Sequence, residues 1–231
     1  MSKRFRHECK YILNPVDAAL MREAVSSICE PDTHAGCEGS YRVRSLYFDT
    51  LDDQYLSENL AGVNLRHKYR IRVYNCDSDR ITLERKETEI GLKHKDSCLI
   101  SLDQCNELMK GNFFVPFEDK QVVLQEMCAE HMLKFLRPAV IVDYLRIPYV
   151  YPSGNVRITF DHNVSSSART EDFLNKDAMI SPVLFDNSVV LEIKYDDLIP
   201  HGIRNIICRH SLNEQTAFSK YVYARSNIKN G

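Results

Sequence analysis

The chain has 231 residues, of which 44% are hydrophobic and 27% are charged, a composition that is ordinary for a globular protein. This composition excludes large-scale disorder, and the length allows one large domain or two small ones with a substantial core. The formal net charge of -2 argues against a general nucleic-acid or membrane-surface binder, because such proteins usually carry a basic excess. Any basic site must therefore be local and balanced by acids elsewhere.

The 8 cysteines are scattered, without a CxxC pair or the spacing of a zinc site, which is typical of reduced thiols. The N-terminus lacks the apolar core of a signal peptide, and no later run approaches the roughly 20 apolar residues of a membrane span. We therefore expect a soluble, cytoplasmic protein with no membrane segment in this chain.

In the first half of the chain, strict alternation of apolar and polar residues predicts strands, and a 3.6-residue apolar period predicts helices. Asn14-Pro15, a cap residue followed by proline, opens the first helix. In chain order the expected elements are a strand over 5–13, a helix over 15–28, a loop over 30–40, a strand over 41–49, a short helix over 51–60 and a hairpin over 65–86.

The second half continues in the same way, and a capping box at 211–214 opens the last predicted helix. No repeat, linker or low-complexity tract interrupts the chain, so we predict a single domain over 1–231, of α+β class, mainly antiparallel β with helices packed outside. The expected elements are a short strand around 92–94, helices over 101–110 and 118–135, a hairpin of strands over 139–147 and 156–161, a polar loop over 165–177, a strand over 189–195 and a last helix ending near 226.

The first hairpin separates an apolar face from a cationic one. Its first strand alternates strictly, so Arg70 and Arg72 lie on the face opposite Ile71. The return strand sets Glu84 and Lys86 against apolar neighbours. A charged face that simply meets water is the ordinary interpretation of such a hairpin.

The same alternation recurs on three further strands, at 6–11, 157–161 and 192–195. Like charges that face one another across a sheet repel unless an anion or interleaved carboxylates compensate them. The repetition of this charged face on four strands therefore favours a sheet whose cationic face encloses a polyanion. The predicted inward set is Lys10, Arg70, Arg72, Lys86, Arg146, Arg157 and Lys194, with Glu8, Glu84 and Glu192 among them.

This mixture of side chains suits a phosphate chain bound together with a divalent cation. Arginine forks match phosphate oxygens, lysines add point charges, and carboxylates hold a hard metal that bridges phosphates. In a closed barrel the exclusion of water would strengthen each of these contacts.

Six short motifs occur in order along nearly the whole chain: RHECKY at 6–11, SLYFDT at 45–50, KYRIR at 68–72, LERK at 83–86, EIKY at 192–195 and FSKY at 218–221. Together they resemble the catalytic domain of the vacuolar transporter chaperone (VTC) family, which belongs to the triphosphate tunnel metalloenzymes. The resemblance implies an eight-stranded antiparallel β-barrel tunnel. It also implies synthesis of inorganic polyphosphate from ATP with Mn²⁺ or Mg²⁺.

Carried over residue by residue, the resemblance implies a phosphate-binding set, a metal-binding set and a catalytic set. Phosphate ligands would be Lys10, Lys68, Arg70, Arg72, Lys86, Arg146, Arg157, Lys194, Ser219 and Lys220, with Arg44 and Arg66 as candidates for one further arginine. Glu192 would be the principal metal ligand, with Glu8 and Glu84 beside it by strand parity. The catalytic set would be Arg70, Arg72, Lys86, Glu192 and Lys194.

One departure concerns the last motif, where the family often has a lysine two residues before the serine and this chain has Ala217. We place Ser219 and Lys220 near the middle of the last predicted helix, close to one tunnel mouth.

Two alternatives share the site: a tripolyphosphatase or nucleoside triphosphatase that uses water as acceptor, and a non-catalytic polyphosphate-binding module. We do not expect nucleic acid as a partner, because the aromatic residues alternate onto the face opposite the basic ones and could not stack bases beside them.

Overall fold

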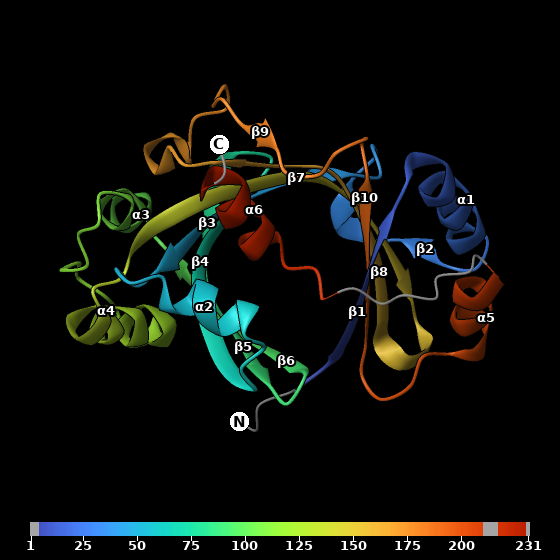
Figure 1. The fold of residues 1–231 in the computed structure, drawn as a ribbon, viewed down its shortest axis with the longest axis horizontal. Helices are drawn as coiled ribbons and strands as arrows, with labels where there is room; N and C mark the ends of the chain where they lie inside the picture. Colours follow the sequence, from blue (N-terminus) through green and yellow to red (C-terminus); the bar gives the residue numbers. More distant parts are fainter. Residues whose placement is uncertain (1–4, 210–216, 230–231) are drawn as a thin grey trace.

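The computed structural model describes residues 5–209 and 217–229 (Figure 1). Its body is one antiparallel sheet in the order β1-β10-β8-β7-β3-β4-β5-β6, with β2 paired to β7 and β9 paired to β8. The strands are β1 (His7–Leu13), β2 (Glu30–Pro31), β3 (Tyr41–Asp49), β4 (Leu65–Tyr74), β5 (Asp77–Glu89), β6 (Leu92–Ile100), β7 (Arg137–Tyr151), β8 (Val156–Ser167), β9 (Ser181–Pro182) and β10 (Val189–Tyr195).

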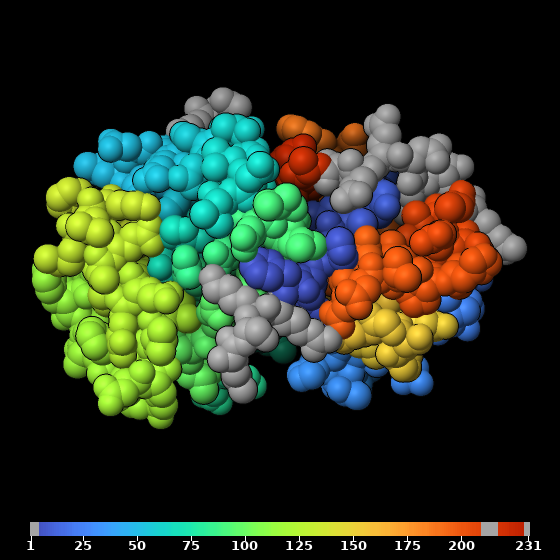
Figure 2. Space-filling model, turned by 90° about the horizontal axis from the view of Figure 1, so that it is seen from below, coloured from blue at the N-terminus to red at the C-terminus, as the bar shows by residue number. Residues whose placement is uncertain are grey.

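The two edge strands of the eight-strand path meet, so the sheet curls into a tunnel. Arg6, just before β1, pairs with Lys93 of β6 through two backbone hydrogen bonds of 3.0 Å. Figure 2 shows β1, in dark blue, side by side with the green β5–β6 hairpin on this face of the molecule. The predicted antiparallel tunnel is thereby confirmed.

Helices cover two sides of the tunnel and bury its apolar outer face. The pair α3 and α4 packs around Leu46, Ile71 and Leu83, while α1 and α5 pack on the outer side of β1, β8 and β10 (Figure 1). Burial of apolar area is the main force that holds such layers together. The helices are α1 (Pro15–Ser26), α2 (Gln54–Leu60), α3 (Leu102–Met109), α4 (Val122–Lys134), α5 (His201–Arg209) and α6 (Lys220–Lys229).

The last helix, α6, lies inside the curve of the sheet rather than outside it (Figure 1). Tyr221 and Ala224 of α6 are buried in one cluster with Tyr47 and Tyr144, which belong to the concave face of β3 and β7. The Tyr221 hydroxyl also bonds the Asp49 carboxylate at the end of β3. The expectation of outer packing therefore holds for α1, α3 and α4, whereas α6 departs from it.

Several boundaries differ from the sequence expectation. Strand β6 extends far beyond the predicted 92–94, and β8 continues to Ser167 into the expected loop. Helix α5 was not expected, although Ile203, Ile206 and Ile207 recur at helical spacing. The predicted capping box at 211–214 lies outside the described residues. Within the described ranges, no helix is both long and apolar enough to cross a bilayer.

Candidate functional site

A chamber at the centre of the tunnel is lined by charged and hydroxyl-bearing side chains. Alternation along β4 places Lys68, Arg70 and Arg72 on its wall, and the register with β5 sets Arg70 opposite Glu84. Most of the predicted phosphate ligands therefore meet in one place. The lining residues are Lys10, Tyr47, Lys68, Arg70, Arg72, Lys86, Tyr144, Arg146, Glu192, Lys194, Ser219 and Lys220.

The two arginines of β4 share one carboxylate. Arg70 Nε donates to Glu84 Oε2 over 2.7 Å, and Arg72 Nη1 lies 3.9 Å from the same oxygen. Lys95 Nζ donates to Glu84 Oε1 over 2.7 Å. Burial disfavours the charged form of Glu84, but these cations outweigh it and hold the pKa of the carboxyl well below its ordinary value. Glu84 therefore stays ionised and orients both guanidinium groups.

Hydroxyl groups from β3 and β7 fix the remaining donors of the same arginines. Arg70 Nη1 donates to Tyr47 Oη over 2.9 Å, while Arg72 donates to Ser45 Oγ over 3.1 Å and to Tyr144 Oη over 3.2 Å. The expectation that aromatic residues face away from the basic ones is therefore wrong for β3 and β7. It holds for the basic strand β4 up to Arg72, but Tyr74 at the end of this strand also lines the tunnel.

Glu8 of β1 and Glu192 of β10 share a group of lysines. Lys10 Nζ lies 2.8 Å from Glu8 Oε1 and 3.9 Å from Glu192 Oε2. Lys86 Nζ donates to Glu8 Oε2 over 2.9 Å, and Lys194 Nζ lies 2.5 Å from Glu192 Oε1. Burial opposes ionisation of both glutamates, but the lysines outweigh it and hold both carboxyl pKa values well below the ordinary one.

Two lysines of the chamber have lowered pKa values, because burial disfavours their charged form. Burial lowers the pKa of Lys86 to about 7, even though Glu8 counteracts the effect. Burial and then neighbouring cations lower the pKa of Lys68 well below its ordinary value. Among the described residues, the hydrogen-bond partners of Lys68 Nζ are neutral: Asn59 Oδ1 at 3.0 Å and Ser219 Oγ at 3.3 Å. Cations gathered in this way are suited to binding an anion.

The donor set fits a divalent cation through two of the three predicted glutamates. Glu8 and Glu192 meet around Lys10, and both side chains are almost completely buried. Mg²⁺ and similar hard cations bind one or two carboxylates and take their other oxygens from phosphates and water. The partners of Glu84 are instead Arg70, Arg72 and Lys95, none of which pairs with Glu8 or Glu192, so we place it apart from these two and outside the proposed metal set. No cluster of three or more potential metal ligands occurs in the part of the chain that the structure describes.

Ser219 and Lys220 lie at the start of α6, whereas the sequence predicted the middle of a helix. Ser219 Oγ accepts a long hydrogen bond of 3.5 Å from the backbone N–H of Val222 and so caps the helix. Lys220 Nζ lies 2.6 Å from Asp161 Oδ2, and Arg146 donates to both oxygens of Asp161 over 2.7 and 2.8 Å. The fully buried Asp161 therefore positions two candidate phosphate ligands. Alternation along β8 places Asp161 inward, but the sequence does not indicate that Lys220 of α6 is its partner.

Arg44 does not reach the tunnel. Its neighbour Ser45 faces inward, so Arg44 faces outward, where it is fully buried. Arg44 Nε donates to Asp143 Oδ2 over 2.6 Å, and Nη1 donates to the carbonyl oxygen of Phe173. The assignment of Arg44 as a phosphate ligand is therefore wrong, because its guanidinium group forms a buried ion pair with Asp143 outside the tunnel.

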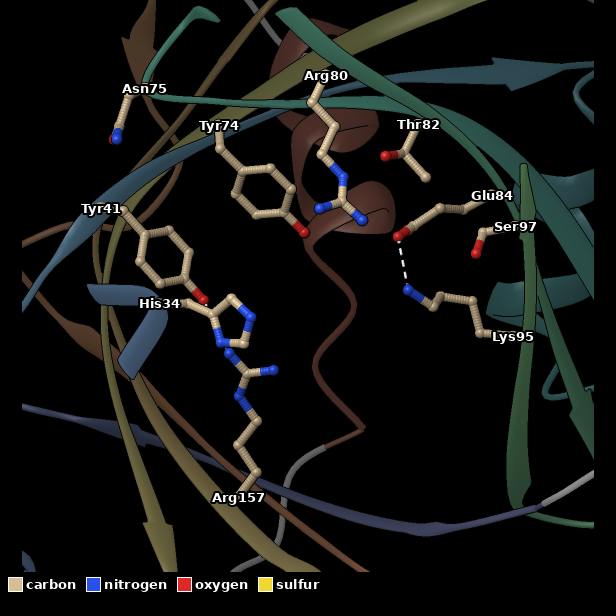
Figure 3. A pocket seen from close by; sticks show the side chains of 10 residues that line it. All are labelled: His34, Tyr41, Tyr74, Asn75, Arg80, Thr82, Glu84, Lys95, Ser97 and Arg157. Carbon is tan, nitrogen blue, oxygen red and sulfur yellow. Dashed lines mark hydrogen bonds and ion pairs between the residues drawn. The ribbon is translucent and has the colours of Figure 1, made fainter. Parts of the chain in front are cut away.

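The described part of the tunnel contains cavities of different character, and we call two of them the basic mouth and the aromatic mouth. The basic mouth is a cavity of about 500 Å³ that is lined by Arg66, Lys68, Lys86, Lys93 and Ser219, among others. The aromatic mouth is a cavity of about 390 Å³ that is lined by His34, Tyr41, Tyr74, Arg80 and Arg157, among others (Figure 3). Of the predicted ligands, Arg66 thus lies at the first mouth and Arg157 at the second.

Two lysines of the tunnel were missed at the sequence level, and both belong to β6. Lys93 lines the basic mouth, and Lys95 lines the aromatic mouth, where it binds Glu84 (Figure 3). The predicted strand around 92–94 was too short to reveal the alternation that places both side chains inward.

Comparison with known proteins gives one family and a group of related folds. A family model described as the VTC domain matches residues 5–228. A search of curated proteins finds no match.

The tunnel is similar to several solved structures. A candidate adenylate cyclase from Bacillus halodurans has a TM-score of 0.58 and 15% identity, with 95% of this chain and 96% of that chain covered. A candidate adenylyl cyclase from Hippeastrum, described as having a dominant triphosphatase activity, has a TM-score of 0.57 and 16% identity, with 96% of each chain covered. A protein from Pyrococcus horikoshii has a TM-score of 0.50 and 14% identity, with 98% of this chain and 99% of that chain covered. At these identities the similarity is one of fold.

Proposed function

The chain belongs to the VTC domain family, and on this basis we propose that it is a polyphosphate polymerase. It transfers the γ-phosphate of ATP to a growing chain of inorganic polyphosphate inside the tunnel. The observation that supports this proposal most is the cluster of cations around Lys68, whose hydrogen-bond partners among the described residues are neutral. A bound polyanion would supply the missing negative charge.

The roles of the chamber residues follow from their contacts. Arg70 and Arg72 are held by Glu84 and by hydroxyl groups, so their forks are fixed before a phosphate binds. Lys86 and Lys194 would add point charges for the phosphates on either side. Lys10, Arg146, Ser219 and Lys220 complete the phosphate-binding wall.

The reaction requires positioning and charge stabilisation rather than a protein nucleophile. A terminal oxygen of the polyphosphate chain attacks the γ-phosphorus in line, a new P–O bond forms, and the bond from the γ-phosphorus to the β–γ bridging oxygen breaks. ADP leaves with the electron pair of that bond. No general base is needed, because the acceptor oxygen is already ionised.

Glu192 and Glu8 are the residues that would hold Mn²⁺ or Mg²⁺. When bound, such a cation supplies charge neutralisation at phosphate oxygens. The two glutamates themselves carry their negative charge at neutral pH, because the lysines around them hold their carboxyl pKa values low.

A hydrolase is the second candidate, because the same site could admit water as acceptor. The similar fold of the Hippeastrum protein, described as having a dominant triphosphatase activity, favours this alternative over a non-catalytic binding module. In a polymerase and in a hydrolase the same cations would bind the triphosphate. The two reactions would differ only in the acceptor of the γ-phosphate, which is the polyphosphate chain in one and water in the other.

Incubation of the purified protein with ATP and Mn²⁺ separates these candidates, with products resolved by gel electrophoresis and phosphorus NMR. We expect a ladder of long phosphate chains and the middle-phosphate resonance of polyphosphate. Free orthophosphate alone would assign the protein as a hydrolase, and unchanged ATP would leave a binding module.

A further inference from the structure

Arg157 of β8 faces the tunnel, but its guanidinium group is held at the aromatic mouth (Figure 3). Alternation along β8 places Arg157 on the same face as Asp161. Its Nη2 lies 2.8 Å from Asp32 Oδ2 and donates to Tyr41 Oη over 3.0 Å. A predicted phosphate ligand is therefore paired with an acid of the protein itself.

Asp32 is fixed in place by backbone contacts. Its N–H donates to the carbonyl oxygen of Pro148 in β7 over 3.1 Å. Its Oδ1 accepts from the backbone N–H of His34 over 2.9 Å and lies 2.7 Å from His34 Nδ1, which leaves Oδ2 for Arg157. Burial raises the pKa of Asp32, but the hydrogen bonds from His34 and the charge of Arg157 outweigh burial and lower it. Asp32 is therefore an ionised acid at a defined position.

This position leaves Arg157 incompletely satisfied. Its Nε is buried and has no hydrogen-bond partner among the described residues. The register of β8 and β10 also sets Arg157 directly opposite Lys194, and like charges at such paired positions repel. Asp32 compensates for part of this repulsion, and a bound phosphate would compensate for it in the same way.

A further cavity joins Arg157 to cations of the chamber. This cavity has a volume of about 330 Å³ and is lined by Arg157, Arg72, Arg146 and Lys194, among others. A phosphate bound there would meet the same arginine that Asp32 holds. Because a guanidinium fork can bind a phosphate through two parallel hydrogen bonds, the phosphate would be a strong competitor for this side chain.

We propose that Asp32 is a positioning residue that competes with phosphate for Arg157. Without phosphate, Asp32 holds the guanidinium group at the aromatic mouth. When a phosphate chain occupies the neighbouring cavity, Arg157 exchanges Asp32 for a phosphate oxygen. Asp32 thereby lowers the affinity of the tunnel for phosphate chains. The inference rests on the proposed function, because it takes the ligand of the tunnel to be a phosphate chain.

The test is the equilibrium binding of inorganic tripolyphosphate to the full chain, measured by calorimetry and expressed per folded molecule. Asp32→Asn removes the competing charge and keeps an oxygen for the backbone N–H of His34, so the Kd falls about tenfold, the effect of one charged hydrogen bond. Asp32→Ser also keeps an acceptor for this N–H and gives the same gain. A merely structural role of Asp32 would weaken binding instead. In an Arg157→Gln background the Asp32 substitutions leave the Kd unchanged, because the contested cation is gone.

Glu30→Gln provides the matched control, because Glu30 is exposed and precedes Asp32 by two positions in the same segment. It removes the same charge and keeps the parent Kd. An unchanged or raised Kd in the folded Asp32 variants, a gain that persists without Arg157, or an equal gain in Glu30→Gln overturns the competition and leaves the proposed function standing. Failure of the parent protein to bind tripolyphosphate overturns both.

Discussion

Lys68 Nζ donates to Ser219 Oγ over 3.3 Å, and this contact joins the middle of the basic strand β4 to the residue that caps α6. Two motifs that are far apart in the sequence therefore meet in one chamber. Among the described residues, the second hydrogen-bond partner of Lys68 Nζ is Asn59, so neither partner is a carboxylate. A phosphate bound beside Lys68 would lie next to both β4 and Ser219 at the start of α6.

Lys68→Met should weaken the binding of long-chain polyphosphate, because a charge-assisted contact is lost while the apolar stem is retained. The expected loss is about 1.5–3 kcal/mol, as for hydrogen bonds to charged groups. Calorimetric titration at low salt measures it, since screening by salt reduces such contacts. The exposed Lys110, changed in the same way, is the control and should leave the affinity unchanged.

Glu192→Gln should abolish turnover, with a loss of about 100-fold or more in kcat, because the charge that would hold a divalent cation beside the phosphates is removed without a change of shape. The variant should lose some stability, because the partly buried Lys10 and Lys194 lose a carboxylate partner, so kcat is compared per folded molecule. The control is Glu84→Gln, which removes a buried tunnel carboxylate outside the metal set. We expect calorimetry to detect Mn²⁺ binding in the Glu84 variant and not in the Glu192 variant, and the reverse pattern would contradict our metal assignment.

Arg72→Lys should lower kcat/KM by about tenfold or more, because lysine cannot reproduce the fork that is fixed by Ser45 and Tyr144. The matched comparison is Arg44→Leu on the neighbouring strand. It should lower the free energy of unfolding by about 2 kcal/mol, because Asp143 loses a buried charged hydrogen bond. Equal kinetic losses per folded molecule in both variants would contradict the distinction between a tunnel arginine and a structural one.

Glu130 should make the fold sensitive to acid. Its carboxylate accepts from Tyr55 over 2.7 Å and contacts His67 and Lys134, each at 2.8 Å. Burial raises its pKa, but these partners outweigh burial and lower the pKa to about 2. The unfolded chain therefore binds the proton first as pH falls, and the stability from this group is lost between about pH 5 and pH 2.

The measurement is the midpoint of urea unfolding as a function of pH. Glu130→Gln should reduce the loss of stability in this interval, whereas Glu126→Gln on the same helix should retain the parent slope. An identical acid dependence in the parent and Glu130→Gln would contradict the assigned role.

Strand alternation was sufficient to predict the inward face of β1, β4, β5 and β10, because each carries charged residues on one side and apolar residues on the other. It did not predict the inward tyrosines Tyr47 and Tyr144. Both faces of β3 and β7 are largely buried, so their sequences lack the contrast that a half-exposed strand shows. The position of Arg44 was missed for the same reason.

The start of α6 depended on tertiary contacts. The concave face of the sheet buries Phe218 before the helix begins, and Lys10 Nζ donates to the Phe218 carbonyl oxygen over 2.9 Å. A local apolar pattern cannot distinguish the non-helical residues 217–219 from a first helical turn. The pairing of Lys220 with Asp161 likewise joins residues that are 59 positions apart, so no local spacing could predict it.

The most direct test of the tunnel polymerase is the fate of labelled phosphate. The parent protein is incubated with Mn²⁺ and ATP that carries ³²P at either the γ- or the α-position, and the products are separated by size. We predict that the γ-label enters long chains that an exopolyphosphatase degrades, while the α-label stays in ADP. Appearance of the γ-label in orthophosphate alone, with no labelled polymer at any time, would contradict the polymerase and favour hydrolysis.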